Sequence, residues 1–494
     1  MSFTEFCCRS GGSNLNAGTV DGSSTEPATA SLVTYTGGDW NATTDVYTAP
    51  VGADMTEAQV GRFASLYHDG DTSPTNNQYM VARIIAVDSG ARTITLSTTA
   101  RMLFGTEVAT GTGNRSMRIG GAWAGMSGSS GFPFSTVSTT ITGSGAITNA
   151  SGDTPRFNFK NDQIYIVTTP VFVSATGPYQ IWGYSSSYGD FGRATIQAAS
   201  GQVIQTTGTP VSVVLADLIV KHTGASGSGH PIYIQGPRNI VLRCVVSSSR
   251  QAGIWWQGAD GRIIECELYN CNQGNNASQA GGITFTGASG LSIERCTIHD
   301  CAGGSNAHGI VIDGTGSCKV SDTIIDSNSG NGIHCNGATN TVSISNCDIY
   351  NNSGDGVRLT SSTASVFCAA NSNFVKNGGY GINNTSNGPF CGLLANCGFG
   401  AGTQANTSGN TNNLRDIQEI GTVTYAADVT PWVDPVNGDF RITLAAAKNA
   451  GRGTFTQTAS SYSGTVGYPD IGAAQSAATG GGSRMVNVRG GADQ

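Results

Sequence analysis

Residues 331–359 read NGIHCNGATNTVSISNCDIYNNSGDGVRL, and this stretch repeats an outline found just before it in the chain. It opens on Asn-Gly-Ile and closes near Asp-Gly-Val, with valine, isoleucine and cysteine at short intervals between them. The preceding stretch, HGIVIDGTGSCKVSDTIID at 308–326, follows nearly the same pattern. Self-similarity at a period of about 20 to 50 residues is typical of repeat architectures.

The repeat can be aligned on three columns of residues. The glycines of the first column are 29, 27, 23, 24 and 25 residues apart, and the column consists of Gly253-Ile254, Gly282-Ile283, Gly309-Ile310, Gly332-Ile333, Gly356-Val357 and Gly381-Ile382. The second column is mostly cysteine: Cys244, Cys266, Cys296, Thr323, Cys347, Ser372 and Cys397. The third is apolar and lies two residues further on: Val246, Leu268, Ile298, Ile325, Ile349, Phe374 and Phe399. A period in the twenties predicts a solenoid.

The alternation within each repeat predicts strands rather than helices. Apolar residues are spaced two apart in three short segments of one repeat, which hold Ile333 and Cys335, Val342 and Ile344, and Cys347 and Ile349. Period two is the spacing of a strand, and the Asn, Gly, Ser and Asp between the segments suit tight turns. Three strands per turn, each paired with its copy in the next turn, predict a parallel β-helix with turns about 4.8 Å apart. Leucine-rich, ankyrin and tetratricopeptide repeats fit poorly, because their consensus residues and helical spacing are missing.

Stacked turns also explain the cysteines. No turn can bury its inward side chains alone, so we interpret the cysteine column as small buried residues of the ladder. The shared spacing of Cys266/Cys271 and Cys296/Cys301 leaves a disulfide or metal role as a less favoured alternative. A polar column at a turn, which we align as Asn270, Asp300, Asp326 and Asn351, is interpreted as side-chain stacking or backbone capping.

Composition limits the partners. The 494 residues include 70 glycines, only 12% are charged, and the net charge is −7 without a basic run. Phosphate binding needs clustered Lys and Arg, so we expect no nucleic-acid partner. No stretch approaches the roughly 18 apolar residues of a membrane span, and the first residues lack the basic and apolar regions of a Sec-type signal.

The two ends depart from the repeat. Residues 1–130 contain alternating segments such as YMVARIIAVDSG at 79–90, which predict a small antiparallel β domain for attachment or assembly. We assign residues 131–415 to the parallel β-helix, with a corner-rich connection, GYSSSYGDFGRA, at 183–194. Residues 416–494 lose the repeat and are expected to form a C-terminal cap and a loose tail, because an open solenoid end exposes strand edges.

The Gly-Ile and Cys-x-Ile columns resemble the right-handed parallel β-helix repeats of the pectate-lyase-like superfamily. The segment DPVNGDFRITLAAAKNAG at 434–451, with YPDIGAAQ at 468–475, is similar to the closing motif of many members of that superfamily. The resemblance covers roughly residues 150–475. It implies an all-β fold and leaves activity open, because this fold carries lyases, hydrolases, phage tailspikes and adhesins alike. The arrangement of an N-terminal β domain before a solenoid is similar to phage fibre and spike proteins.

One face of the predicted solenoid carries candidate ligand-binding residues. Two outward columns run along it: Trp255, Thr284, Val311, His334, Arg358 and Asn383, and beside them Gln257, Thr286, Asp313, Asn336, Thr360 and Thr385. From these we select a candidate glycan-binding face, because tryptophan can stack on a sugar ring and the polar groups can bond hydroxyls or a carboxylate; it consists of Trp255, Gln257, Asp313, His334, Asn336 and Arg358. A solvated face without a function is the alternative interpretation.

The sequence identifies no catalytic residue, metal ligand or cofactor. A glycosidase needs two carboxylates about 5 to 9 Å apart, and the outward acids are too sparse for that. The cluster of Asp or Glu with Arg or Lys on one sheet, which the resemblance to pectate lyases would imply, is missing. His308 and His334 are the only histidines near the face, and histidines in such places are more often structural.

We therefore expect a structural virion protein, such as a phage fibre, spike or capsid-surface protein with a β-helical shaft, assembled in the host cytoplasm. Its expected partners are other virion proteins or copies of itself, since such proteins are commonly trimers, and carbohydrate. The alternatives are a polysaccharide lyase or glycoside hydrolase on the same solenoid, and a bacterial surface adhesin located outside the cell.

Overall fold

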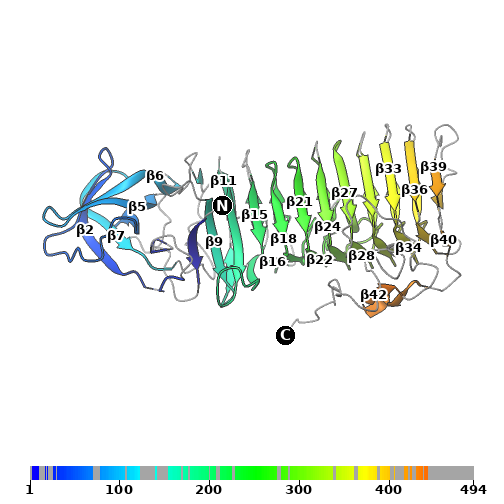
Figure 1. The fold of residues 1–494 in the computed structure, drawn as a ribbon, viewed down its shortest axis with the longest axis horizontal. Helices are drawn as coiled ribbons and strands as arrows, with labels where there is room; N and C mark the ends of the chain where they lie inside the picture. The colour runs from blue at the N-terminus through cyan, green and yellow to red at the C-terminus, as the bar shows by residue number, and fades with distance from the viewer. Residues whose placement is uncertain are drawn as a thin grey trace, which may run out of the picture. The chain divides into compact units, whose positions relative to one another are not determined.

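The structure is a computed structural model whose contacts divide the chain into two compact units, Met1–Val245 and Val246–Gln494. Figure 1 shows strands joined by turns, with sheets running along the solenoid. The structure describes residues 3–9, 17, 19–20, 26–28, 30–69, 78–105, 108–122, 140–141, 154–167, 171–175, 178–199, 201–206, 212–224, 229–274, 280–287, 290–337, 341–360, 365–385, 390–395, 397–400, 405–406, 417–420, 423–424, 430–437 and 439–442.

The first unit contains a closed antiparallel barrel, which confirms the predicted antiparallel β structure near the N-terminus; the bounds 1–130 and the role in attachment or assembly stay predictions. Its strand order is β2-β3-β6-β5-β4-β7, and the core holds Trp40, Tyr47 and Met80 at 0–1% exposure. The indole of Trp40 donates to the Val108 carbonyl (2.9 Å), so the one polar atom of this ring is bonded inside the barrel. The strands are β2 (Val33–Asn41), β3 (Val46–Thr48), β4 (Phe63–His68), β5 (Gln78–Asp88), β6 (Thr93–Gly105) and β7 (Gly111–Ile119).

The same unit also contains the first coils of the solenoid, in three parallel sheets. The first strand of the chain joins them, because β1 (Phe3–Cys8) pairs in parallel with β9, and Phe6 contacts Phe63 of the barrel edge-on at 5.5 Å. The sheets have the orders β1-β9-β12-β15-β18, β10-β13-β16 and β8-β11-β14-β17. Their strands are β8 (Thr140–Ile141), β9 (Thr154–Lys160), β10 (Ile164–Val167), β11 (Val171–Ala175), β12 (Tyr179–Tyr184), β13 (Ala194–Ala198), β14 (Ile204–Thr206), β15 (Val213–Ala216), β16 (Leu218–His222), β17 (Ile232–Ile234) and β18 (Ile240–Leu242), and β19 (Val245–Ser247) lies at the boundary between the units.

The second unit continues as regular coils of three short strands. One sheet contains β20 (Ile254–Trp256), β23 (Gly281–Phe285), β26 (His308–Ile312), β29 (Ile333–Cys335), β32 (Val357–Leu359), β35 (Ile382–Asn384) and β38 (Ala405–Asn406). The next contains β21 (Gly261–Ile264), β24 (Leu291–Glu294), β27 (Ser317–Ser321), β30 (Thr341–Ser345), β33 (Ser365–Ala370), β36 (Phe390–Ala395) and β39 (Ile417–Ile420). The third contains β22 (Glu267–Tyr269), β25 (Thr297–His299), β28 (Ile324–Asp326), β31 (Asp348–Tyr350), β34 (Asn373–Val375), β37 (Gly398–Phe399) and β40 (Val423–Thr424).

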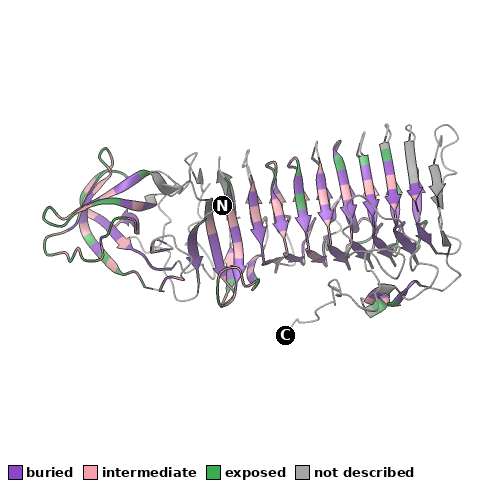
Figure 2. Cartoon of the chain, in the orientation of Figure 1, coloured by how far each residue is buried: buried purple, intermediate pink, exposed green. Residues whose placement is uncertain are grey.

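The predicted columns lie in register in this unit. Leu268 pairs with Ile298, Ile298 with Ile325, and so on to Phe374 with Phe399, whose rings stack at 5.3 Å. Figure 2 shows buried residues recurring from coil to coil along the described strands. Each fully buried apolar side chain stabilises the fold by about 1.5–3 kcal/mol, and it reaches that burial only with a neighbour above and below.

The cysteine column is also as predicted. The backbone N–H of Cys296 donates to the Thr323 hydroxyl (3.3 Å) and that of Cys347 to the Ser372 hydroxyl (3.1 Å), so successive members touch. Both cysteines are at most 1% exposed, and the 12 cysteines whose side chains the structure describes are free thiols. Cysteine is therefore used here as a small buried side chain.

The polar corner column is correct except at one position. Asn270, Asp300 and Asn351 adopt left-handed backbone conformations with φ of 51–54°, and Ser327 occupies this position in its own coil with φ 57°. The structure places Asp326 one residue earlier, in register with His299. The sharp corner explains the composition of the column, because short polar residues tolerate positive φ better than apolar ones.

The described part of the C-terminal region packs against the flank of the second unit. A hairpin of β41 (Trp432–Asp434) and β42 (Asp439–Ile442), joined through a 3₁₀ turn at Pro435–Asn437, brings Trp432 and Phe440 together. Both rings contact Tyr350 of β31, at 5.2 and 5.9 Å. Within residues 416–494, assigned to the cap, the described strands β39 and β40 continue the solenoid sheets and β41 and β42 form this hairpin; a cover over the last coil stays a prediction.

The glycine column has a steric cause that predicts the effect of substitution. A Cβ on Gly332 would lie 2.6 Å from Ile349 Cγ2 and from the Gly356 carbonyl oxygen, whereas a Cβ on Gly290 would meet nothing closer than 3.4 Å. We expect Gly332→Ala to lower the free energy of unfolding by about 1–3 kcal/mol through overpacking. Gly290→Ala, the matched control, should change it by less than about 0.5 kcal/mol. Urea denaturation of both variants checks this, and equal effects would contradict it.

Candidate functional site

The face selected from the sequence lies on the outer side of the sheet that contains β20, β23, β26, β29 and β32. The paired strands place Trp255 beside Thr284, Val311 beside His334, and His334 beside Arg358, as the repeat predicts. The second column is stacked too, because Asn336 bonds Asp313 (3.3 Å) and Thr360 bonds Asn336 (3.0 Å). The predicted register of the face is therefore correct.

The structure does not bring all six predicted residues together. Thr284 and Val311 are fully buried although they occupy outward positions. Trp255 lies three coils before His334, about 14 Å away along the solenoid, and its indole donates to the Thr286 hydroxyl (3.2 Å). The other four predicted residues, Asp313, His334, Asn336 and Arg358, lie on three successive coils. Their assignment to glycan binding stays a prediction.

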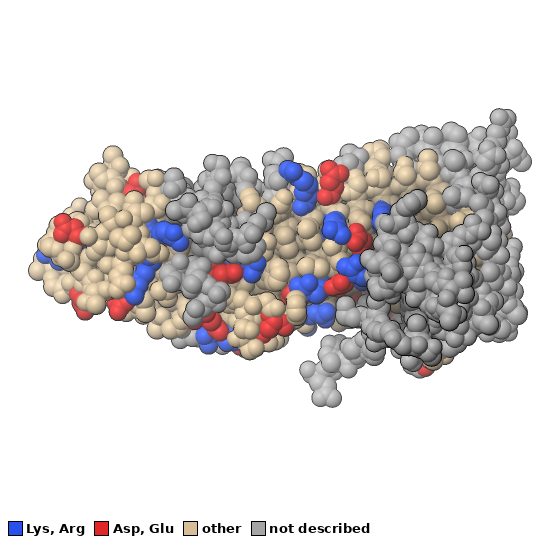
Figure 3. Space-filling view, viewed as in Figure 1, with Lys and Arg blue, Asp and Glu red and all other residues tan. Residues whose placement is uncertain are grey.

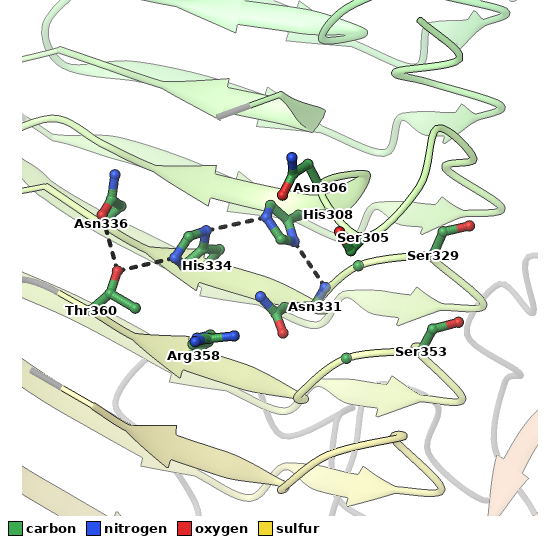
Figure 4. Close-up of a pocket in the computed structure, with 12 residues that line it drawn as sticks. Ser305, Asn306, His308, Ser329, Asn331, His334, Asn336, Ser353, Arg358 and Thr360 are labelled. Atoms are coloured by element: carbon green, nitrogen blue, oxygen red, sulfur yellow. Dashed lines mark hydrogen bonds between the residues drawn. The ribbon is translucent and has the colours of Figure 1, made fainter. Parts of the chain in front are cut away.

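A groove of about 460 Å³ lies over these coils (Figure 4). Turns contribute its serine and asparagine side chains, and the strands β26, β29 and β32 contribute its histidines and Arg358. The lining residues are Ser305, Asn306, His308, Ser329, Gly330, Asn331, His334, Asn336, Ser353, Gly354, Arg358 and Thr360. Trp255, Gln257 and Asp313 do not line it. The sequence-based selection missed the serines and Asn331, because they lie in turns whose approach to the sheet depends on the folded coil.

A directional chain of hydrogen bonds crosses the groove wall, as drawn in part in Figure 4. The backbone N–H of Asn331 donates to His308 Nδ1 (2.9 Å), so neutral His308 carries its proton on Nε2. That N–H donates to His334 Nδ1 (3.2 Å), which places the His334 proton on Nε2, from where it is donated to Thr360 Oγ1 (3.0 Å). The chain continues through the Asn336 amide to the Asp313 carboxylate. A single backbone group thus fixes both tautomers.

Electrostatics keep both histidines neutral. Burial lowers the pKa of His308 to about 3, with the neighbouring His334 and Arg358 acting in the same direction. Burial and Arg358 lower the pKa of His334 to about 4, and the carboxylate of Asp355 opposes this shift. Asp355 is itself buried and accepts hydrogen bonds from the Tyr380 backbone N–H and the Asn383 amide, both at 2.8 Å.

The groove therefore presents hydrogen-bond donors together with a single positive charge. Among the described lining residues, only Arg358 is ionised at neutral pH, and it is exposed and makes no ion pair within the described ranges. Both ring nitrogens of His334 are already bonded within the protein. Asn331 accepts the Asp355 backbone N–H with its Oδ1 (2.8 Å), which leaves its Nδ2 group for the groove. A ligand would meet a guanidinium, an amide N–H and serine hydroxyls, which suit an anionic oxygen.

Asp355 lies beside the groove without lining it: it is buried, bonds Tyr380 and Asn383, and acts on the pKa of His334. Asp313 is joined to the groove only through Asn336, and burial raises its pKa. Asp326 and Asp348 are buried on the sheet that contains β28 and β31. In the described part of the chain, no group of three or more His, Cys, Asp or Glu side chains could hold a metal ion.

Charge elsewhere is dispersed. On the face seen in Figure 3, the Lys and Arg side chains of the described residues alternate with Asp and Glu. Ion pairs among the described residues include Arg262 with Glu294 (2.9 Å) and Arg295 with Glu265 (2.9 Å). Such a surface does not favour a phosphate backbone. In the parts of the chain that the structure describes, no helix has the length and apolarity needed to cross a membrane.

The histidine pair predicts acid sensitivity with a defined sign. An unfolded histidine binds a proton near pH 6.5, whereas folded His334 stays neutral to about pH 4. Between these values the unfolded state binds more protons, so stability present at neutral pH is lost as the pH falls. We expect His334→Gln to flatten this dependence. Thermal unfolding between pH 7 and pH 4 measures it, and parallel curves for the variant and the wild type would contradict the assignment.

The central coils match a known protein-family model. Residues 212–369 match the family model described as the right handed beta helix region. Together with the parallel strand order, this match confirms the right-handed parallel β-helix predicted from the repeat. No curated protein matches the sequence significantly.

Solved structures with a similar chain path include enzymes and phage proteins. The pectate lyase Pel9A is 13% identical with a TM-score of 0.36, covering 65% of this chain and 88% of that one. The Dettilon tailspike protein is 13% identical with a TM-score of 0.35, covering 59% and 66%. The tailspike protein gp49 from Pseudomonas phage LKA1 is 12% identical with a TM-score of 0.30, covering 81% and 64%. Such distant likenesses carry no conclusion about function. What the chain shows is an all-β molecule with a right-handed parallel β-helix and a small antiparallel barrel.

Proposed function

We propose that this chain is a structural protein of a virion surface, a fibre or spike with a β-helical shaft, and that the groove around Arg358 binds an acidic glycan. The observation that carries the glycan proposal is the single exposed guanidinium in a groove lined otherwise by neutral polar groups. Serine hydroxyls and amides bond sugar hydroxyls, and Arg358 can bond a carboxylate in a bidentate manner.

The groove supports binding more than cleavage. Hydrolysis of a glycosidic bond needs an acid and a second carboxylate across the bond. Among the described residues, two acids lie next to the groove and neither lines it: Asp313 bonds Asn336, and Asp355 is buried and bonds Asn383. The histidines are neutral, and a general base must reach the proton it removes, whereas both nitrogens of His334 are bonded within the protein.

Polysaccharide cleavage remains a second candidate because of one observation. Asp313 has a raised pKa and ends a chain of hydrogen bonds that reaches both histidines, and environments of this kind occur at catalytic sites. Incubation with polysaccharides that the protein binds, followed by assays for new reducing ends and for unsaturated products, decides between the two. Products that disappear in Asp313→Asn would establish catalysis.

The structural role draws on the form of the chain. A self-contained barrel followed by coils that bury cysteine, isoleucine and valine supplies a stiff shaft with an attachment module. The expected partners are virion proteins and further copies of the chain. Electron microscopy of particles labelled with an antibody to this protein tests the location, and light scattering measures the oligomer. Absence from purified particles would overturn the virion part of the proposal.

Arg358→Gln tests the glycan part. The variant keeps a polar side chain at an exposed position, so we expect stability within about 0.5 kcal/mol of the wild type. Loss of a charge-assisted bond should weaken binding of carboxylated glycans about tenfold or more. The measurement is binding to an array of acidic and neutral bacterial polysaccharides. Lys376→Gln removes an equal charge at an exposed site outside the groove and is the matched control; equal losses in both variants would contradict the proposal.

A further inference from the structure

A loop in the first unit holds an exposed aromatic ring in an unfavourable backbone conformation. The loop joins β12 and β13 and contains Phe191, whose φ is 63° and whose side chain is 63% exposed. Among the described residues other than glycine with positive φ, Phe191 is the only apolar one. Positive φ is a genuine outlier for a bulky residue, and glycine would occupy this conformation without strain. Exposure to water offers no compensation for the strain through burial.

The loop is built to maintain this conformation. The carboxylate of Asp190 accepts the backbone N–H groups of Ser185, Ser186, Ser187 and Gly192 at 2.6–3.0 Å. It also accepts the hydroxyls of Ser185 (2.8 Å) and Ser186 (2.9 Å). These bonds hold the pKa of Asp190 well below its usual range. Six donors on one carboxylate fix the backbone on both sides of Phe191.

The ring continues a stack of guanidinium groups and aromatic rings. Arg243 lies 4.6 Å from the Phe191 ring centroid and 5.8 Å from that of Trp182, and Arg156 lies 4.6 Å from Trp182. Asp217, which is buried, holds Arg243 through two bonds of 2.7 Å. Glu5 and Gln180 hold Arg156. Each cation is thus fixed and balanced by an acid, so the stack is rigid without an excess of charge.

We propose that Phe191 is a stacking platform for a sugar ring of a glycan, at a site separate from the Arg358 groove. A single exposed ring matches the face of one sugar, whereas a protein interface needs about 800 Å² on each partner. Ser186 and Ser187 are exposed and belong to the same loop as Phe191. Their hydroxyls can bond sugar hydroxyls. The balanced cations disfavour a ligand that is recognised mainly by charge. The strain fits this role, because strained residues that a structure holds firmly cluster at ligand sites.

The experiment exploits the strain. Phe191→Gly removes the ring and suits the left-handed backbone; relief of strain opposes the greater freedom of the unfolded chain and the loss of the Arg243 contact, so the variant should fold with a Tm close to that of the wild type. Binding of the full-length protein is measured on an array of purified capsular and O-antigen polysaccharides. We expect Phe191→Gly to weaken binding to a subset of them about tenfold or more, and Phe191→Trp to keep that binding.

The outcome separates this site from the groove. Arg358→Gln should weaken binding of acidic polysaccharides only. If one variant loses binding and the other does not, the site whose variant keeps full binding is the one whose proposal fails. The Phe191 proposal is overturned if no polysaccharide depends on Phe191, including the case in which only binding to a protein is lost. It is also overturned if Phe191→Trp loses binding as fully as Phe191→Gly, since stacking tolerates one aromatic ring for another.

Discussion

Everything in the second unit depends on contact between equivalent side chains of successive coils. A three-residue strand such as β29 has no stability of its own, because it buries only two side chains inward and by itself leaves its backbone groups without partners. The coils on either side supply both: Ile333 pairs with Ile310 on one side and Val357 on the other. The glycine before each of these residues is part of the same constraint: a Cβ on Gly309 or Gly332 would overlap the isoleucine of its own coil, and a Cβ on Gly356 would overlap the Gly381 carbonyl oxygen. The repeat in the sequence is the consequence of this mutual dependence.

The groove arises where the repeat varies. Residues that point outward are not needed for stacking, so they are free to differ from coil to coil, and successive coils carry Val311, His334 and Arg358 at one position. The histidine at 308 adds a second ring at the start of its strand, 4.7 Å from that of His334. Because the coils are rigid, these side chains face one another in fixed geometry. The bonds of His334 to His308 and Thr360 also explain why a polar cluster this buried is tolerated, since each ring nitrogen has a partner.

The two candidate sites use the scaffold in different ways. At the groove, the regular coils place side chains on ordinary strand backbone next to one another. Function there would come from the combination of residues on neighbouring strands. At the loop of residues 185–193, the regular structure is interrupted, and Asp190 supports a conformation that the chain would otherwise avoid. Corners of the solenoid also adopt positive φ, and they use polar or charged residues there, mostly Asn, Asp and Ser but also Glu265, Arg295 and Lys376. Phe191 differs from these in being apolar and exposed, so the corner geometry does not account for it.

The sequence by itself determined the parallel solenoid, the register of its columns and the buried state of its column cysteines. It could do so because the period-two alternation and the period of the repeat are local and recur several times, so one mistaken residue, such as Asp326 in the corner column, does not disturb the alignment. Only the tertiary structure decided which outward residues meet. Thr284 and Val311 read as surface positions but are buried, which separates Trp255 from His334. Whether an outward side chain reaches water depends on the turns that fold over it, and those turns have no period from which their path can be predicted.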